Sequence, residues 1–425
     1  MPMFTHMLSL DADHRVGPHA RVLRCVKSEE LFVLVPLVIV LAACAAPSTN
    51  ATNAVPTVAS AGSASTPCAF PAPAPAPAAL LPAPVYFLGS DSQIWRLSTD
   101  GSTLTQITHE TAPVRYFDVS PTTGALAYIT ANTLVCADSL GGGRHVLVEG
   151  PVPTDSADES RLSTEMNRLR WSPDGSRVAY GLNGVNLYDI RTATPSVLIM
   201  NDAVPGSFAT PTSTSLNLYS PGDWSPDGSR LLVNVSFYPE GGGLAILNPA
   251  DGTLVKLSSP DGPVCCYFAW SSDSKSVYFA NDSIGMVASG LWRADAASGS
   301  AVTLVAGESN GAFMLVAHPF SLADGQLDYF MATSPALPNT FVPLAMTRSD
   351  ADGVSNRAAL RVDTSLPYEA LWSPDGSGAL IVDRVGQIVT EQDPFLIYGP
   401  LDWLKADASP PMVLPVQGFA IRWGK

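Results

Sequence analysis

A short motif, Trp-Ser-Pro-Asp-Gly, recurs in this chain and constrains its fold more than any other feature. Complete copies begin at Trp171, Trp224 and Trp372, and a shorter copy begins at Trp270. In each copy the Pro, Asp and Gly favour a tight turn, and the alternating apolar residues that follow favour a strand. Because the unit returns roughly every fifty residues or at twice that interval, the sequence indicates a repeat architecture built from small sheets.

Weaker copies extend this pattern. One begins at Val119, a degenerate one at Ala317, and the segment from Phe419 to Trp423 resembles the start of another. A second strand pattern follows each unit, as in Leu291-Trp-Arg-Ala294, and it also stands first in the region as Ile94-Trp-Arg-Leu97. Each repeat thus has an upstream half, the Trp-Ser-Pro-Asp-Gly unit with its strand, and a downstream half, the strand pattern that follows. The repeat region begins with a downstream half and ends with an upstream half.

This order predicts an all-β protein, a β-propeller that is closed by pairing of its N- and C-terminal strands in one blade. Seven upstream and seven downstream halves favour seven blades, and six blades are the alternative because the copy between 315 and 330 is poor. The strand from Phe419 to Trp423 would complete the blade that begins at Val85. Such closure removes exposed sheet edges.

The repeats resemble the PD40 (WD40-like) repeats of the TolB-type propeller, most clearly at the three complete copies. Members of this family include envelope scaffold proteins and propeller domains of prolyl-oligopeptidase-like peptidases. The resemblance therefore implies a fold and leaves the activity open. The sequence shows neither the N-terminal α/β domain of TolB itself nor the hydrolase domain of the peptidases.

The first 43 residues have the pattern of an export signal. Basic residues precede an uninterrupted apolar run from Leu31 to Ala43, which is short for a membrane-spanning helix. The run ends in Leu41-Ala-Ala-Cys44, which resembles the lipobox of bacterial lipoproteins. This resemblance implies that residues 1–43 are removed and that Cys44 carries the lipid. An uncleaved membrane anchor is the alternative.

The next segment, 44–84, has the composition of a tether. It carries no charged residue after Cys44 and consists largely of Ala, Pro, Ser and Thr, a composition that favours an extended chain without a core. We therefore predict a signal peptide at 1–43, a lipidated tether at 44–84 and a propeller at 85–425. The protein is expected to be exported and held by lipid on the bacterial cell membrane, on its outer face or its periplasmic side.

Composition narrows the class of partner. The chain has 23 Lys and Arg against 38 Asp and Glu, a formal net charge of −15. This balance argues against binding to nucleic acid, which requires clustered basic residues. Histidines are few and unclustered, so no metal or other cofactor is expected. Asp350-Ala-Asp-Gly353 lacks the closing Glu of an EF-hand and is interpreted as a hairpin turn.

Two patterns that resemble active-site motifs have simpler interpretations. Asp174, Asp227 and Asp375 occur once per repeat, as the turn requires. Gly307-Glu-Ser-Asn-Gly311 matches a nucleophile elbow around Ser309, with His318 nearby. That elbow needs a helix after it, and here another strand pattern follows. We therefore predict no catalytic residue.

Side-chain alternation along the inner strands predicts a charged arc in the central channel. If each repeat Trp packs between blades, the residue before it faces the channel. The charged members of this set are Asp118, Arg170, Asp223 and Arg422, and ring closure would place Arg422 beside Asp118. Their alternating signs indicate either a self-neutralising ion-pair network or the polar wall of a site for a small ligand or peptide. The other positions of this ring are Ala269, Val316 and Leu371.

Two adjacent cysteines, Cys265 and Cys266, precede one inner strand. They are a candidate vicinal disulfide at a loop, as an exported chain allows. The alternative is that they are two strand residues facing opposite ways, one of them buried.

These features predict a non-enzymatic, lipid-anchored propeller that binds an envelope protein or peptide through loops on one face. The alternative is an extracytoplasmic enzyme that cleaves glycans or peptides, or a small-ligand sensor, with its site at the channel mouth. An enzyme of this kind would need paired carboxylates or a base in the channel. The predicted loops are 109–115, 159–168, 261–266 and 365–369.

Overall fold

The computed structural model describes residues 79–152, 161–202, 216–238, 242–283, 288–336, 342–384, 388–389 and 397–425. All of them belong to the unit Gly62–Lys425. The predicted signal segment, Cys44 and most of the tether lie outside the described residues, so their assignment stays a prediction. Within the described ranges, α1 (Arg161–Thr164) is a single short turn, and no helix has the length and apolarity that crossing a membrane requires.

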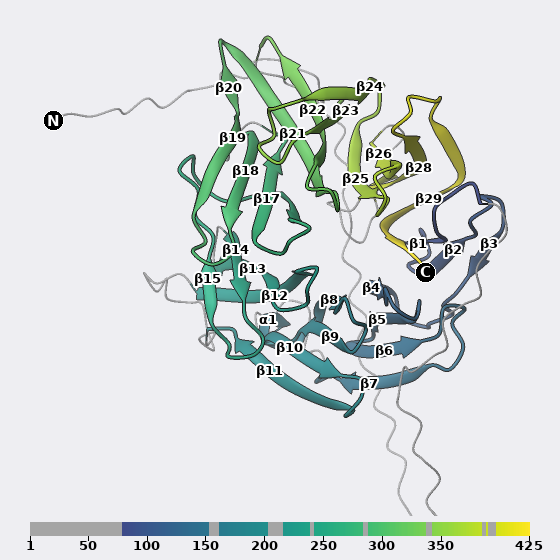
Figure 1. Ribbon diagram of the computed structural model, residues 1–425. Helices are drawn as coiled ribbons and strands as arrows, with labels where there is room; N and C mark the ends of the chain where they lie inside the picture. Colours follow the sequence, from purple (N-terminus) through teal and green to yellow (C-terminus); the bar gives the residue numbers. More distant parts are fainter. Residues whose placement is uncertain are drawn as a thin grey trace, which may run out of the picture. The chain divides into compact units, whose positions relative to one another are not determined.

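Antiparallel sheets follow one another around a central axis, which Figure 1 shows end-on. The first two sheets comprise β4 (Val114–Val119), β5 (Leu126–Thr130), β6 (Thr133–Ala137) and β7 (His145–Glu149), and then β8 (Asn167–Trp171), β9 (Arg177–Gly181), β10 (Gly184–Asp189) and β11 (Thr194–Met200). The next two comprise β12 (Leu216–Trp224), β13 (Leu231–Tyr238), β14 (Gly242–Leu247) and β15 (Leu254–Lys256), and then β16 (Tyr267–Trp270), β17 (Ser276–Asn281), β18 (Gly290–Asp295) and β19 (Ala301–Ala306).

The fifth sheet has one additional short strand at its edge. It comprises β20 (Glu308–Ser309), β21 (Ala312–Ser321), β22 (Leu327–Ser334), β23 (Ala345–Ser349) and β24 (Ala358–Arg361). The last and largest sheet joins the two ends of the repeat region. It comprises β25 (Pro367–Trp372), β26 (Gly378–Asp383), β27 (Ile388–Val389), β28 (Ile397–Lys405), β29 (Met412–Trp423), β1 (Val85–Leu88), β2 (Ile94–Leu97) and β3 (Leu104–Gln106).

The long strand β29 connects two blades within this last sheet. Its first part pairs with β28, with Met412 opposite Trp403, and its second part pairs with β1, with Trp423 opposite Val85. The second part is thus the inner strand of a blade that β1, β2 and β3 complete. The predicted closure by the N- and C-terminal strands is confirmed, and the pairing is consistent with seven blades.

The inner strands of the described blades contact one another in order around the axis, namely β4, β8, β12, β16, β21, β25 and β29, with β29 returning to β4. The repeat tryptophans pack between neighbouring blades, which is the condition on which the predicted channel positions depend. Trp171 lies in a core cluster with Ala127 of β5 and Val178 of β9, and Trp270 lies in one with Leu232 of β13. These contacts orient the alternate side chains toward the axis.

The repeated motif forms the expected turn in each complete copy. In the first, the Ser172 hydroxyl donates to Asp174 at 2.6 Å, and the Ser176 amide donates to the same carboxylate at 3.0 Å. Gly175 has a φ of 67°, a conformation that glycine adopts without steric cost. The equivalent carboxylates of Asp227 and Asp375 accept from the amides of their own turns. These aspartates are therefore turn residues.

Candidate functional site

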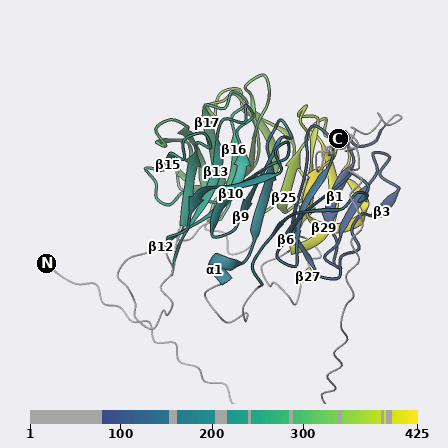
Figure 2. The ribbon, with the colours of Figure 1, turned by 90° about the horizontal axis from the view of Figure 1, so that it is seen from below.

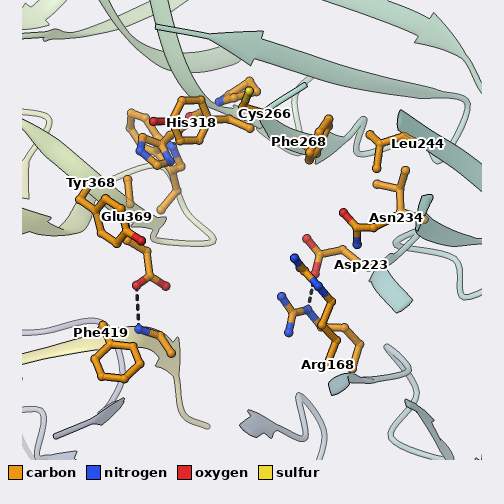
Figure 3. A pocket seen from close by; sticks show the side chains of 18 residues that line it. Arg168, Asp223, Asn234, Leu244, Cys266, Phe268, His318, Tyr368, Glu369 and Phe419 are labelled. Atoms are coloured by element: carbon orange, nitrogen blue, oxygen red, sulfur yellow. Dashed lines mark hydrogen bonds and ion pairs between the residues drawn. The ribbon is translucent and has the colours of Figure 1, made fainter. Parts of the chain in front are cut away.

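A cavity of about 590 Å³ lies among the inner strands, and residues of β8, β12, β13, β16, β21, β25 and β29 line it. Figure 3 shows its two dissimilar sides. Arg168, Asp223 and Asn234 lie on one side, and His318, Tyr368, Glu369 and Phe419 lie on the other. We call the first side the charged wall and the second the aromatic wall. Phe268 and Leu244 also lie on the first side, and Glu369 lies among the aromatic residues of the second.

Arg170 and Asp223 form an ion pair across neighbouring blades on the charged wall. The Arg170 Nε donates to Asp223 Oδ1 at 2.5 Å. The Asp223 side chain is 56% exposed because it faces the open cavity. Its depth within the ring favours the neutral acid, but the Arg170 guanidinium outweighs this effect and holds the pKa of Asp223 below its ordinary value. Asp223 is therefore ionised and paired.

Arg422 and Asp118 form the second predicted pair. The Arg422 Nε lies 3.2 Å from Asp118 Oδ1, and the other oxygen of Asp118 accepts the Trp171 amide at 2.8 Å. Asp118 of β4 therefore connects β29 on one side with β8 on the other. The four charged residues predicted to form the arc lie in two ion pairs, as the self-neutralising interpretation requires, while Arg170 and Asp223 also line the cavity.

Glu369 is a further acid of the cavity wall. Its two carboxylate oxygens accept the backbone amides of Ala420 at 2.7 Å and Ile421 at 3.0 Å, and Arg422 lies 3.7 Å away. Burial raises the pKa of Glu369, while the Arg422 charge and these amides oppose the rise. The sequence placed Glu369 only at the end of a predicted binding loop, because nothing in the repeat marks its position.

His318 and its neighbours form the opposite wall. The imidazole packs 4.0 Å from the Tyr267 ring, between ring centroids, and its Nε2 is buried without a hydrogen-bond partner among the described residues. Burial lowers the pKa of His318 to about 3, and the charge of Arg384 acts in the same direction. His318 is therefore neutral near pH 7.

A repeated hydrogen bond shows why His318 lies at the channel. The indole of Trp224 donates to the Arg170 carbonyl, that of Trp270 to Asp223, and that of Trp372 to His318. His318 thus occupies in its blade the position that Arg170 and Asp223 occupy in theirs.

The prediction that Val316 faces the channel is wrong. Val316 is fully buried in a core cluster with Tyr278 and Leu327. The pairing of β21 with β22 shifts between Ala317 and Phe320, and a Pro stands where other blades have Trp. The channel position therefore lies two residues later than the alternation predicted.

Bulges in the inner strands shape the wall of the cavity. Arg168, His318 and Ala420 all line it, and all have left-handed φ values, of 45°, 49° and 53°. The strand pairing around each of them shifts register. A bulge re-aims side chains and interrupts the ladder, and such backbone conformations gather at functional sites. Three separate blades share this feature at one cavity.

The two adjacent cysteines lie at the edge of the same cavity. Cys265 and Cys266 are joined by a disulfide, and Cys266 lines the cavity just before β16. The sequence singled out this pair and its loop.

Of the other predicted loops, 159–168 contributes Arg168 and 365–369 contributes Tyr368 and Glu369. Loop residues 159–160 lie outside the described part of the chain. Asn234 and Phe268 carry no signature in the sequence beyond an ordinary strand pattern. Phe419 was predicted only as the first residue of the closing strand and not as part of a site.

The elbow-like motif is not part of this site. Ser309 is exposed in the two-residue strand β20, opposite Ala312 in a hairpin, and no helix follows it. The hairpin at Asp350 is held by its own hydrogen bonds, including one from Asn356 to Asp350 at 2.8 Å. Within the described ranges, no group of three or more metal-ligating side chains comes together.

Comparisons with known proteins concern the fold. No protein-family model and no curated protein matches the sequence. Among solved structures, TolB from Acinetobacter baumannii is 17% identical, with a TM-score of 0.41 over 78% of this chain and 77% of that chain. An oligogalacturonate lyase in complex with manganese is 13% identical, with a TM-score of 0.49 over 77% of this chain and 82% of the other.

Proposed function

We propose that this chain is a lipid-anchored, extracytoplasmic β-propeller that binds a protein or peptide of the bacterial cell envelope in its central cavity. The observation that carries the proposal is a cavity of about 590 Å³ in which the charged wall faces the aromatic wall. This volume lies within the range of ligand-binding sites. Arginine and aromatic side chains, which line this cavity, are also the residue types that dominate binding energy at interfaces.

The acids of the cavity favour binding over catalysis. Cleavage of a glycan by a pair of carboxylates requires one acid that gives a proton and another that is free to attack or to activate water. Asp223 is held by Arg170, and both oxygens of Glu369 accept backbone amides. These contacts support a wall that recognises a ligand rather than one that transfers protons.

The location in the envelope rests on the N-terminal sequence. The apolar run from Leu31 to Ala43 and the lipobox-like Leu41-Ala-Ala-Cys44 support export and lipid attachment. Two or three acyl chains on Cys44 would anchor the protein stably, whereas a single chain would not. The Ala/Pro-rich tether would then hold the propeller away from the membrane surface.

A capture experiment tests this function. The full chain is purified from membranes in detergent, immobilised and exposed to envelope extract of the source cell. A charge-reversed variant, Arg170→Glu with Arg422→Glu, is used in parallel. A second variant, Arg170→Asp with Asp223→Arg, preserves one pair in reversed order and controls for folding. We expect one or a few proteins to be retained by the parent and lost with the charge-reversed variant.

Two results would count against the proposal. If the parent and the charge-reversed variant retain the same proteins and melt at the same temperature, binding does not depend on the charged residues of the cavity. Failure of the parent to retain any protein would favour the small-ligand alternative. Soluble glycans and metabolites would then be screened by melting temperature, since a ligand of the native state raises it.

A further inference from the structure

Arg168 is placed where two cavities meet. It lines the central cavity and also a second one of about 300 Å³, which lies among the first residues of β4, β8 and β12. The second cavity includes Tyr116 of β4 and Tyr219 of β12. Because β8 begins soon after α1, which lies at one face of the ring (Figure 2), a ligand that enters the channel from this face passes Arg168.

The backbone directs this side chain into the cavity at a conformational cost. Arg168 has a φ of 45°, and the pairing of β8 with β9 shifts between Asn167 and Leu169. Leu169 is fully buried, whereas Arg168 is exposed to the cavity. A left-handed conformation in a long side-chain residue persists only where the surrounding structure imposes it. The bulge therefore presents a guanidinium that regular alternation would not orient in this way.

Arg168 also lacks the direct ion pair that the other charges of the wall form among the described residues. Arg170 is paired with Asp223, and Glu369 lies near Arg422. No described residue forms a hydrogen bond or an ion pair with the Arg168 side chain. Burial and the neighbouring Arg170 charge lower the pKa of Arg168, while the charge of Asp223 acts in the opposite direction. The Arg168 guanidinium therefore has five N–H donors that face the cavity and are available to an anionic ligand.

We propose that Arg168 binds a carboxylate of an acidic peptide segment that lies in the central cavity. This inference rests on the proposed function and names the chemistry of its ligand. The planar guanidinium fork matches a carboxylate in two parallel hydrogen bonds.

The surroundings favour a single negative charge. Asp223 and Glu369 line the same cavity, so they would repel a phosphate dianion or a run of acidic residues. Phe268, Tyr368 and Phe419 provide apolar surface for the residues on either side of the carboxylate. The structure thus fits a peptide with one Asp or Glu among apolar or aromatic residues. A uronic acid is the other source of a single carboxylate.

Peptide selection on the full chain tests this inference. A displayed library of random heptapeptides is selected on the detergent-purified protein and on Arg168→Gln. Peptides from the parent selection are then synthesised in Glu and Gln versions, and their affinities are measured by fluorescence anisotropy. We expect Asp or Glu at one position of the selected peptides. We also expect the Gln version to bind the parent about tenfold or more weakly, as loss of a charge-assisted pair implies.

Matched variants separate recognition from folding. Arg168→Gln should bind the Glu and Gln versions equally while melting like the parent, and Arg168→Lys should retain only part of the preference. Arg115→Gln removes an arginine of the neighbouring cavity that is already paired with Glu165, so the Glu preference should persist.

The outcomes distinguish this inference from the proposed function. Peptides that bind the parent with no preference for Glu would overturn the carboxylate assignment and leave the peptide-binding function in place. If no peptide is selected by the parent, the peptide-binding function itself fails. Trigalacturonate is the second probe. If it binds in an Arg168-dependent way and no acidic peptide does, the ligand is an acidic sugar and the assignment of an acidic peptide is overturned.

Discussion

At the scale of single residues, Asp118 is the acid that joins three neighbouring inner strands. It accepts Arg422 of β29 and the Trp171 amide of β8 while standing in β4. Its side chain is only 12% exposed, so both contacts are shielded from water. Such a residue couples blades that are distant in sequence, and its removal should affect the whole ring.

The Asp118→Ala variant should therefore lose stability. It leaves the Trp171 amide without an acceptor and Arg422 without its nearest acid, which we expect to cost about 2–3 kcal/mol in the free energy of unfolding. Asp118→Asn keeps an acceptor for the amide and should lose less. Urea denaturation measures both. Equal losses in the two variants would show that the amide contact contributes nothing.

A second residue-scale prediction concerns the pH dependence of stability. Burial, together with the nearby charge of Asp383, raises the pKa of Asp402 from 3.8 to about 6. Between these pH values the folded state keeps a proton that the unfolded state releases, so stability falls as pH rises from about 4 to about 6. The Asp402→Asn variant should not show this decrease in stability with pH. Its free energy of unfolding at pH 7 should exceed that of the parent by about 1 kcal/mol, after allowance for solvent screening.

Denaturant unfolding at pH 4 and pH 7 tests this expectation. The advantage of Asp402→Asn should be much smaller at pH 4, where the folded state binds the proton and the unfolded state binds it about half of the time. Asp324→Asn changes the same net charge at an exposed turn and serves as the control. An equal gain in both variants would mean that net charge, and not the site of Asp402, determines the effect.

Side-chain alternation predicted those cavity residues that stand beside a repeat Trp, and it missed those that a bulge places in the cavity. Alternation predicted Arg170 and Asp223, because each stands directly before a repeat Trp that packs between blades, and the side chain next to such a Trp points to the opposite face. The same rule failed at Val316, where β21 has a bulge and a Pro replaces Trp. Bulges depend on neighbouring strands, so the sequence of one strand does not reveal them. For the same reason Arg168 did not emerge as a distinct residue of the site.

At the scale of elements, β29 has a role that the sequence only partly indicated. Phe419 to Trp423 was predicted as the closing strand, and the pairing with Val85 confirms it. The preceding residues Met412–Gln417, which pair with β28 in the previous blade, carried no repeat signature. A single strand that serves two blades has no turn between its parts. The turn residues that reveal the other blades are therefore missing there.

Two substitutions within β29 test its part in closure. Ile421 is fully buried between β1 and the neighbouring blade, whereas Val413 on the same strand is 69% exposed. Ile421→Ala should cost about 2–5 kcal/mol through lost contacts and a cavity. Val413→Ala should change stability by no more than about 0.5 kcal/mol. Similar losses in the two variants, measured by urea denaturation, would contradict the assigned packing of the closing strand.

At the scale of the whole molecule, the proposed function combines a lipid anchor at the membrane with a ring that binds a partner. The anchor is tested with Cys44→Ser in a bacterial host, using a clickable fatty acid and membrane fractionation. The variant should lose both the lipid label and membrane retention, because acyl chains on Cys44 supply the membrane affinity. Cys68→Ser, within the tether, should keep both. An unlabelled variant that still sediments with membranes would favour an uncleaved apolar anchor.

Site-specific photo-crosslinking tests whether a partner occupies the cavity. A photoreactive phenylalanine analogue is placed in the full chain at Phe268, which lines the cavity, or at Leu140, which is 65% exposed elsewhere on the ring. Both variants are irradiated in living cells after their melting temperatures have been matched to the parent. We expect a discrete crosslinked protein or peptide from position 268 and none from position 140. The same products from both positions, or none from 268, would contradict this expectation.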